Sequence, residues 1–273
     1  MSAPARLDRS LIRASGPDAR GFLQNVLTQS LDRLDAAGVL YSALLSPQGK
    51  VLADMMLWAE AEGGLMIDAD PARGADLMRR LSMYKLRANA KLEDVSGAHA
   101  VLVSTDRFEG ARDDPRLPNG ALGWRAISAV DSGQNGTAAY EARRIALGVP
   151  DLARDAAAEE VFALEALLEE LNGVDFQKGC FVGQENVSRM KRRATTRKKF
   201  CPIVFEGPAP APGTPVMAGA AELGSVRSGM EGRAIALLRL DRAVSATALL
   251  TADGRPVRLD PPAWLILPQR EQG

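Results

Sequence analysis

The chain has 273 residues and a mass of 29.1 kDa, with 34 basic side chains, 34 acidic side chains and one histidine. A hydrophobic share of 46% and a charged share of 25% are typical of folded proteins and exclude disorder, collagen and coiled coil. No run reaches the roughly 18 apolar residues of a membrane span, and the zero formal charge argues against a whole surface that binds DNA or RNA. The two cysteines, Cys180 and Cys201, suit a reducing compartment, so we predict a cytoplasmic location.

The same counts limit metal chemistry. Cys180, Cys201 and His99 are the only soft ligands, which is too few for a four-cysteine iron–sulfur cluster or a structural zinc site, so we predict no metal. His99 lies in the apolar run 98–103, which predicts a strand, and we interpret it as a structural residue. We interpret Cys201 as a packing residue.

The N-terminal segment has the closely spaced arginines of a transit peptide. Asp8 and Asp18 interrupt that pattern, and an apolar h-region is missing, so we expect this segment to be part of the fold.

The first hundred residues predict strands and helices in alternation without a fixed repeat, which favours an α+β fold over a helical solenoid. The expected elements are a strand over 11–15, a helix from about 18 to 31, a hairpin of 39–45 and 51–58 around a Pro-Gly turn, a strand over 65–69 and a helix over 71–87.

The next hundred residues predict a polar loop over 106–118 and two helices. The first helix covers about 137–147 and ends at Gly148, where a left-handed cap precedes Pro150. The second covers about 159–171, with valine and leucines forming a buried stripe.

After residue 200 the pattern changes to short apolar runs separated by glycines, which predicts a small β-barrel. We therefore divide the chain into an N-terminal α+β region 1–100, a second α+β region 101–195 and a barrel 200–273.

The segment 173–189 carries the strongest chemical signal. Gly179 and Gly183 frame Cys180, a spacing that lets the backbone turn tightly and hold the thiol at a loop apex. Lys178 and Arg189 lie near it in sequence, and a cation favours the thiolate, the form that attacks electrophiles and binds metals. The alternative is a buried cysteine packed as a small apolar residue.

The run 178–185, Lys-Gly-Cys-Phe-Val-Gly-Gln-Glu, resembles the lysine-glycine-cysteine-aromatic-x-glycine-glutamine-glutamate signature of the YgfZ family of folate-binding proteins. The resemblance extends along the chain through 22–28, 44–50, 84–87, 148–150 and 223–226. That family is similar to the T-protein of the glycine cleavage system. The resemblance implies an α+β, three-domain ring of the T-protein type, with tetrahydrofolate or a derivative in a central opening and a C-terminal barrel. The first domain of that fold is discontinuous, so region 101–195 is expected to share a domain with residues 1–35.

The resemblance also implies a function. It indicates an accessory factor that binds reduced folate and helps iron–sulfur proteins, including radical enzymes that modify tRNA, to assemble or to survive oxidative stress. Partners would be assembly proteins or client enzymes, because one chain lacks the ligands of a stable cluster. The implied site residues are Cys180 as a reactive thiol, Lys178 as its electrostatic partner, and Gly179, Gly183, Gln184, Glu185, Arg189, Asp54 and Arg87 as signature or ligand-binding residues.

Two other functions stay open at this point. Aminomethyl transfer is the T-protein reaction, but the T-protein hairpin carries two adjacent aspartates where this chain has only Asp54, which either lies near the pterin or faces water. The segment 189–199 carries seven basic residues and no acidic one, a charge that would attract polyglutamylated folate, RNA or an acidic protein, unless it is only a solvated face. Direct RNA binding is the weakest of these, because Phe181 and Phe200 are the only aromatic residues nearby.

Overall fold

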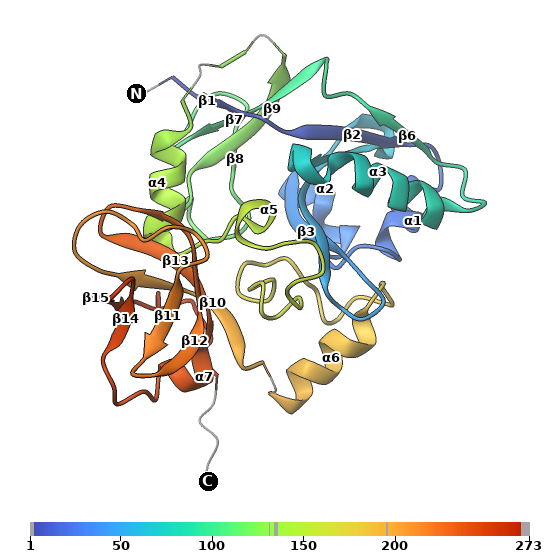
Figure 1. Cartoon of the computed structure of the whole chain (residues 1–273). Helices are drawn as coiled ribbons and strands as arrows, with labels where there is room; N and C mark the ends of the chain where they lie inside the picture. The colour runs from blue at the N-terminus through green and yellow to red at the C-terminus, as the bar shows by residue number, and fades with distance from the viewer. Residues whose placement is uncertain (1–2, 131, 134–135, 195, 269–273) are drawn as a thin grey trace.

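The computed structural model describes residues 3–130, 132–133, 136–194 and 196–268. Its strands form three antiparallel sheets, which Figure 1 shows around a centre filled by helix α5 (Leu152–Asp155) and the segment that follows it. The mixture of helices and sheets confirms the predicted α+β class. No helix in the described ranges is long and apolar enough to span a membrane.

The five-stranded sheet has the order β3-β4-β5-β2-β6. Its strands are β2 (Ser10–Ser15), β3 (Val39–Leu45), β4 (Val51–Ala59), β5 (Leu65–Ala69) and β6 (Lys91–Asp94). The hairpin of β3 and β4 is confirmed, with Val39 opposite Trp58 and a bulge after Leu44. Side chains alternate across β3, so Tyr41 and Leu45 pack toward the centre while Leu40 and Leu44 pack against the helices of the outer face.

The helices of that outer face are short except one. They are α1 (Ala19–Gln24), the 3-10 turn η1 (Leu31–Arg33), α2 (Leu34–Ala37) and α3 (Pro71–Lys85), and a second 3-10 turn, η2 (Ala61–Gly63), connects β4 to β5. Helix α3 begins where the sequence predicts, because Asp70 accepts the Ala72 N–H and Pro71 occupies the first turn. The predicted helix over 18–31 is wrong beyond Gln24. Residues 27 and 28 instead join the edge of β3, where the Thr28 N–H donates to the Ala43 carbonyl at 3.0 Å.

The four-stranded sheet has the order β1-β7-β9-β8. Its strands are β1 (Ala5–Leu7), β7 (His99–Ser104), β8 (Arg112–Asp113) and β9 (Trp124–Ala129). Strand β8 lies inside the predicted loop 106–118, because it pairs with β9. Strands β1 and β2 belong to different sheets although they are consecutive, so the first fifteen residues connect the two sheets. The predicted domain boundaries remain a prediction.

Helix α4 (Ala138–Leu147) packs beside the four-stranded sheet and ends as predicted. Gly148 takes the left-handed conformation (φ 79°), and the Val149 N–H donates back to the Arg144 carbonyl at 3.0 Å.

The predicted helix over 159–171 is wrong. Glu159 and Leu167 both have φ near 62°, which interrupts any helix, and the segment forms consecutive turns instead. Its beginning pairs with the hairpin edge, where the Val51 N–H donates to the Val161 carbonyl at 2.9 Å and the Ala163 N–H donates to the Gly49 carbonyl at 3.1 Å. The expected apolar side chains are nevertheless buried, because the turns place them in the same core as the hairpin and the barrel.

The C-terminal barrel is confirmed as a seven-stranded sheet of order β15-β14-β11-β12-β13-β10-β16. Its strands are β10 (Lys198–Val204), β11 (Pro215–Ala218), β12 (Ala221–Met230), β13 (Arg233–Arg239), β14 (Leu250–Ala252), β15 (Arg255–Pro256) and β16 (Arg258–Leu259), and helix α7 (Leu240–Ala243) follows β13. Helix α6 (Gln184–Arg193), which the sequence analysis did not predict, precedes the barrel at the periphery of the molecule (Figure 1).

Candidate functional site

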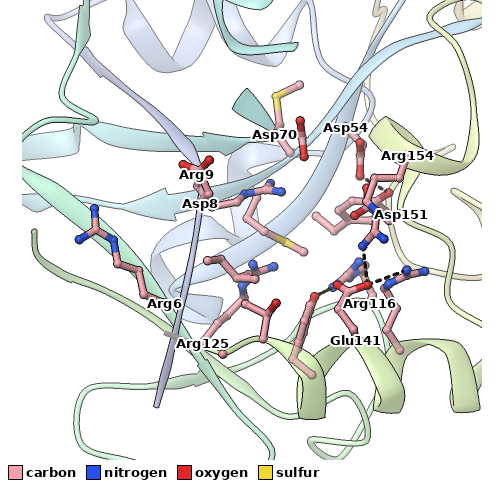
Figure 2. Close-up of a pocket in the computed structure, with 18 residues that line it drawn as sticks. Arg6, Asp8, Arg9, Asp54, Asp70, Arg116, Arg125, Glu141, Asp151 and Arg154 are labelled. Carbon is pink, nitrogen blue, oxygen red and sulfur yellow. Dashed lines mark hydrogen bonds and ion pairs between the residues drawn. The ribbon is translucent and has the colours of Figure 1, made fainter. Parts of the chain in front are cut away.

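A cavity of about 450 Å³ lies where the five-stranded sheet, the four-stranded sheet, α4 and α5 meet. Its size is within the range of small-molecule sites. Figure 2 shows charged side chains from all of these elements pointing into it. The charged lining residues are Arg6, Asp8, Arg9, Asp54, Asp70, Arg116, Arg125, Glu141, Arg144, Asp151 and Arg154.

Three buried or half-buried guanidinium groups form one wall of the cavity. Arg9 and Arg125 share the carboxylate of Asp68, and Arg125 and Arg116 share that of Asp114. The Arg125 contacts are long, at 3.6 Å to Asp68 and 3.4 Å to Asp114, and its Nε has no hydrogen-bond partner among the described residues although the side chain is 2% exposed. Three cations therefore share two anions, and one buried donor remains unused.

Asp54 and Asp151 add carboxylates to the same cavity. The Tyr41 hydroxyl donates to Asp54 Oδ2 at 2.9 Å, and Arg116 lies over the Tyr41 ring at 5.7 Å from its centroid. Burial, followed by the nearby charge of Asp151, raises the pKa of Asp54, while Arg9 and Arg116 act in the opposite direction. Burial and the Asp54 charge likewise raise the pKa of Tyr41 well above its usual value. The cavity thus offers acceptors and donors within one small space.

This donor and acceptor set fits the pterin ring of a folate. A pterin presents amino and ring N–H donors beside carbonyl and ring-nitrogen acceptors, which Asp54 and Asp151 on one side and Arg116 and Arg125 on the other can satisfy. The Arg125 Nε is buried without a hydrogen-bond partner among the described residues, although a buried polar group is normally paired. That Asp54 contacts a pterin remains a prediction, although the residue does line the cavity.

The signature loop is fixed to the five-stranded sheet by Lys178. Its ammonium group donates to the carbonyl oxygens of Leu27 at 2.6 Å and Gln29 at 3.0 Å, and it lies over the Phe181 ring at 5.6 Å. Burial lowers the pKa of Lys178 to about 8. The structure therefore gives Lys178 backbone carbonyl partners in addition to any effect on the neighbouring thiol.

Cys180 is an exposed free thiol beside this anchor. Gly179 is exposed with open space around it, whereas Gly183 has φ 81° and lies so close to the hairpin turn that a Cβ would stand 2.6 Å from the Ser46 carbonyl oxygen. Only glycine fits there, so the loop is held on both sides of the thiol.

The rest of the signature begins α6. The Gln184 N–H donates to the Phe181 carbonyl at 3.2 Å. Glu185 is exposed in the first turn, where its carboxylate interacts favourably with the positive end of the helix dipole. Arg189 is exposed and donates to Asn186 Oδ1 at 2.7 Å. Arg87 is exposed after the end of α3. The ligand-binding roles predicted for these residues stay predictions.

The cavity and the signature are separate features joined by one hairpin. Among the described residues, the cavity lining includes Asp54 but takes no residue from 173–199 and does not include Arg87. Tyr41 and Asp54 line the cavity from the middle of the hairpin, while Ser46 and Gly49 at its turn contact Gly183. Cys180 therefore does not line the cavity.

Sequence reasoning missed most of the cavity wall. Arg9, Arg116, Arg125 and Asp151 come from four separate segments, and no spacing between them indicates that they meet. Within the described ranges there is no cluster of three or more histidine, cysteine or acidic residues that could hold a metal ion. Cys201 is fully buried, and burial raises its pKa to about 12.

Comparisons with known proteins identify what this arrangement is similar to. The profile of the CAF17 C-terminal β-barrel domain matches residues 197–266. The iron–sulfur cluster assembly factor IBA57 of Mus musculus, a mitochondrial protein, is 30% identical, with 92% of this chain aligned to 82% of that protein. The human IBA57 is 29% identical at similar coverage, and the IBA57 homolog of Neurospora crassa is 30% identical over 74% of this chain. The chain spans only 54% of the length of the Neurospora protein.

Among solved structures, the aminomethyltransferase T of the glycine cleavage system from Bartonella henselae superposes with a TM-score of 0.76 over 98% of this chain and 86% of that one, at 15% identity. This likeness confirms the predicted ring of the T-protein type. The predicted cytoplasmic location is contradicted, because the names of the IBA57 relatives assign them to mitochondria.

Proposed function

Because the chain belongs to the family of the iron–sulfur cluster assembly factor IBA57, we propose that it assists the assembly or repair of iron–sulfur proteins with Cys180 as its reactive thiol and a reduced folate in the central cavity. The observation that carries the proposal is the exposure of Cys180 on a loop fixed by Lys178 on one side and Gly183 on the other. A thiol that must reach a cluster or a partner needs this accessibility, and a packing cysteine does not.

The thiol acts together with other proteins in this proposal. A cluster with four thiolate ligands needs more sulfur than this chain offers, because Cys201 is buried in the barrel core and Cys180 is the remaining cysteine. Assembly proteins or client enzymes would supply the other ligands. The cluster is cargo, and the chain is an accessory factor.

The folate would occupy the cavity. Asp54 and Asp151 would accept hydrogen bonds from the pterin, Arg116 and Arg125 would donate to it, and Tyr41 and Met56 would provide apolar contact. A bound reduced folate would supply a carrier for one-carbon units. The chain's own contribution is to orient the ring and to exclude water from it.

The thiol is tested by Cys180→Ser in cells that lack the native protein. The variant should fold and bind folate normally, yet lose support of iron–sulfur enzymes. Gln177→Ala, an exposed change in the same loop, serves as the matched control and should retain support. Full activity of the Cys180 variant would remove the thiol from the mechanism.

The folate is tested by titrating the purified protein with tetrahydrofolate. We expect binding at micromolar concentrations that Arg125→Met weakens at least tenfold, because that change removes a buried donor from the cavity wall. Arg107→Met, an exposed arginine outside the cavity lining, is the control. Absence of binding by the unmodified protein would reject the folate part and leave the thiol part standing.

A folate-dependent aminomethyltransferase is the second candidate, favoured by one observation. The T-protein hairpin carries two adjacent aspartates, and here Asp151 places a second carboxyl group close enough to Asp54 to raise its pKa, although it comes from another segment. Release of a methylene group from an aminomethyl carrier protein in the presence of tetrahydrofolate would favour this function over the accessory role.

A further inference from the structure

The exposed face of α6 carries an arginine strip made of Arg189, Arg192 and Arg193. These residues stand at positions i, i+3 and i+4, so their side chains are neighbours on one side of the helix. Arg189 donates to the neutral Asn186, and Arg192 donates to the Ser188 carbonyl oxygen. In the part of the chain that the structure describes, no carboxylate forms an ion pair with the strip.

Two lysines close to the strip do have carboxylate partners. The other basic residues around α6 include Lys191, which pairs with Glu169, and Lys199, which is buried and pairs with Glu170. Neighbouring like charges on a helix repel each other, so a strip without acidic partners destabilises the free protein slightly. A partner that brings carboxylates would remove this repulsion.

We propose that the arginine strip is a docking surface for an acidic protein that meets the chain beside Cys180. The inference rests on the proposed function, since the exposed Cys180 lies four residues before α6, and the exposed arginines follow on that same helix. Complementary charge is the physical basis, because it steers encounter and fixes the orientation of two surfaces. The docked surface would present its own cluster ligands to Cys180.

An acidic protein fits this surface better than RNA or a membrane. Single-stranded RNA is held by exposed aromatic faces, but Phe181 and Phe200 are buried and the Phe176 ring is covered by Lys191 at 3.8 Å. A membrane-binding helix needs an exposed apolar face, whereas Val187 of α6 is buried and Met190 packs on the core.

The test uses the full chain and a fluorescent peptide of ten glutamates as the probe. The peptide should bind, its affinity should fall with added salt, and Arg189→Gln/Arg192→Gln/Arg193→Gln should weaken binding about tenfold or more. Replacement of the same three residues by lysine should retain most of the affinity. The control is Arg79→Gln/Arg80→Gln on α3, where both arginines pair with Asp76, and it should bind normally.

Three results would overturn the proposal. The first is equal peptide binding by the triple glutamine variant, and the second is tighter binding of an RNA oligonucleotide of equal charge. The third concerns folate: if the native protein binds pentaglutamyl tetrahydrofolate more tightly than the monoglutamyl form and the triple variant does not, the strip binds the folate tail instead of a protein. In cells the triple variant should lose support of iron–sulfur enzymes while binding monoglutamyl tetrahydrofolate normally. If peptide binding fails while folate still binds and Cys180 is still required in cells, the docking inference is rejected and the proposed function stands.

Discussion

Lys178→Met tests whether the signature loop is anchored by a buried ammonium group. The side chain is 8% exposed, and burial lowers its pKa from 10.5 to about 8. Between these two values the unfolded chain still holds a proton that the folded chain has released, so the free energy of unfolding rises with pH through this window. At about 1.36 kcal/mol for each pH unit, the whole effect is about 3 kcal/mol.

The methionine variant lacks this titration. The difference in unfolding free energy, native protein minus variant, should therefore increase by about 2.5 kcal/mol between pH 7 and pH 10. Urea unfolding followed by tryptophan fluorescence at both pH values measures it, and all other titrating groups cancel because both proteins contain them. Lys91→Met, at an exposed lysine, should show no such increase. A difference that stays constant within about 0.5 kcal/mol would refute the buried ammonium group.

Three further predictions concern the hairpin contact, the cavity and the segment before the barrel. Gly183→Ala should destabilise the protein by at least about 1–2 kcal/mol because of its left-handed backbone and its contact with the turn, whereas Gly179→Ala should be tolerated; equal melting temperatures would contradict this. The pKa of Asp54 is raised in the folded protein, so its titration lowers the free energy of unfolding as pH rises above 3.8. Asp54→Asn should lack this decrease when the free energy is measured by urea unfolding between pH 4 and 7. Glu170→Gln leaves Lys199 buried without its carboxylate and should cost about 3–5 kcal/mol in urea unfolding; a cost below about 1 kcal/mol would argue against burial of the pair.

Features set by neighbours in sequence were predictable. The Pro-Gly turn of the β3–β4 hairpin, the Asp70 cap of α3 and the Gly148 cap of α4 each depend on a few consecutive residues, and each appears where the sequence indicates. The signature was also recognisable, because its glycines and cysteine lie within a few positions of each other.

Features set by distant residues were not predictable. The leucine stripe of 159–171 has helical spacing, but pairing with the hairpin edge and the left-handed Leu167 replace the helix with turns that bury the same side chains. The cavity wall depends on Arg9 pairing with Asp68 and on Arg125 reaching both Asp68 and Asp114, which lie in other segments. A single arginine in a sequence gives no sign of such a partner.

The position of the β3–β4 hairpin limits how this protein can diverge. The hairpin carries both the cavity wall at Asp54 and the turn that contacts Gly183, so a substitution that shifts the hairpin moves both and couples the proposed folate and thiol functions. The exposed side of α6 does not contribute to the cavity wall. Its exposed charges can change without altering the cavity wall or the contact at Gly183.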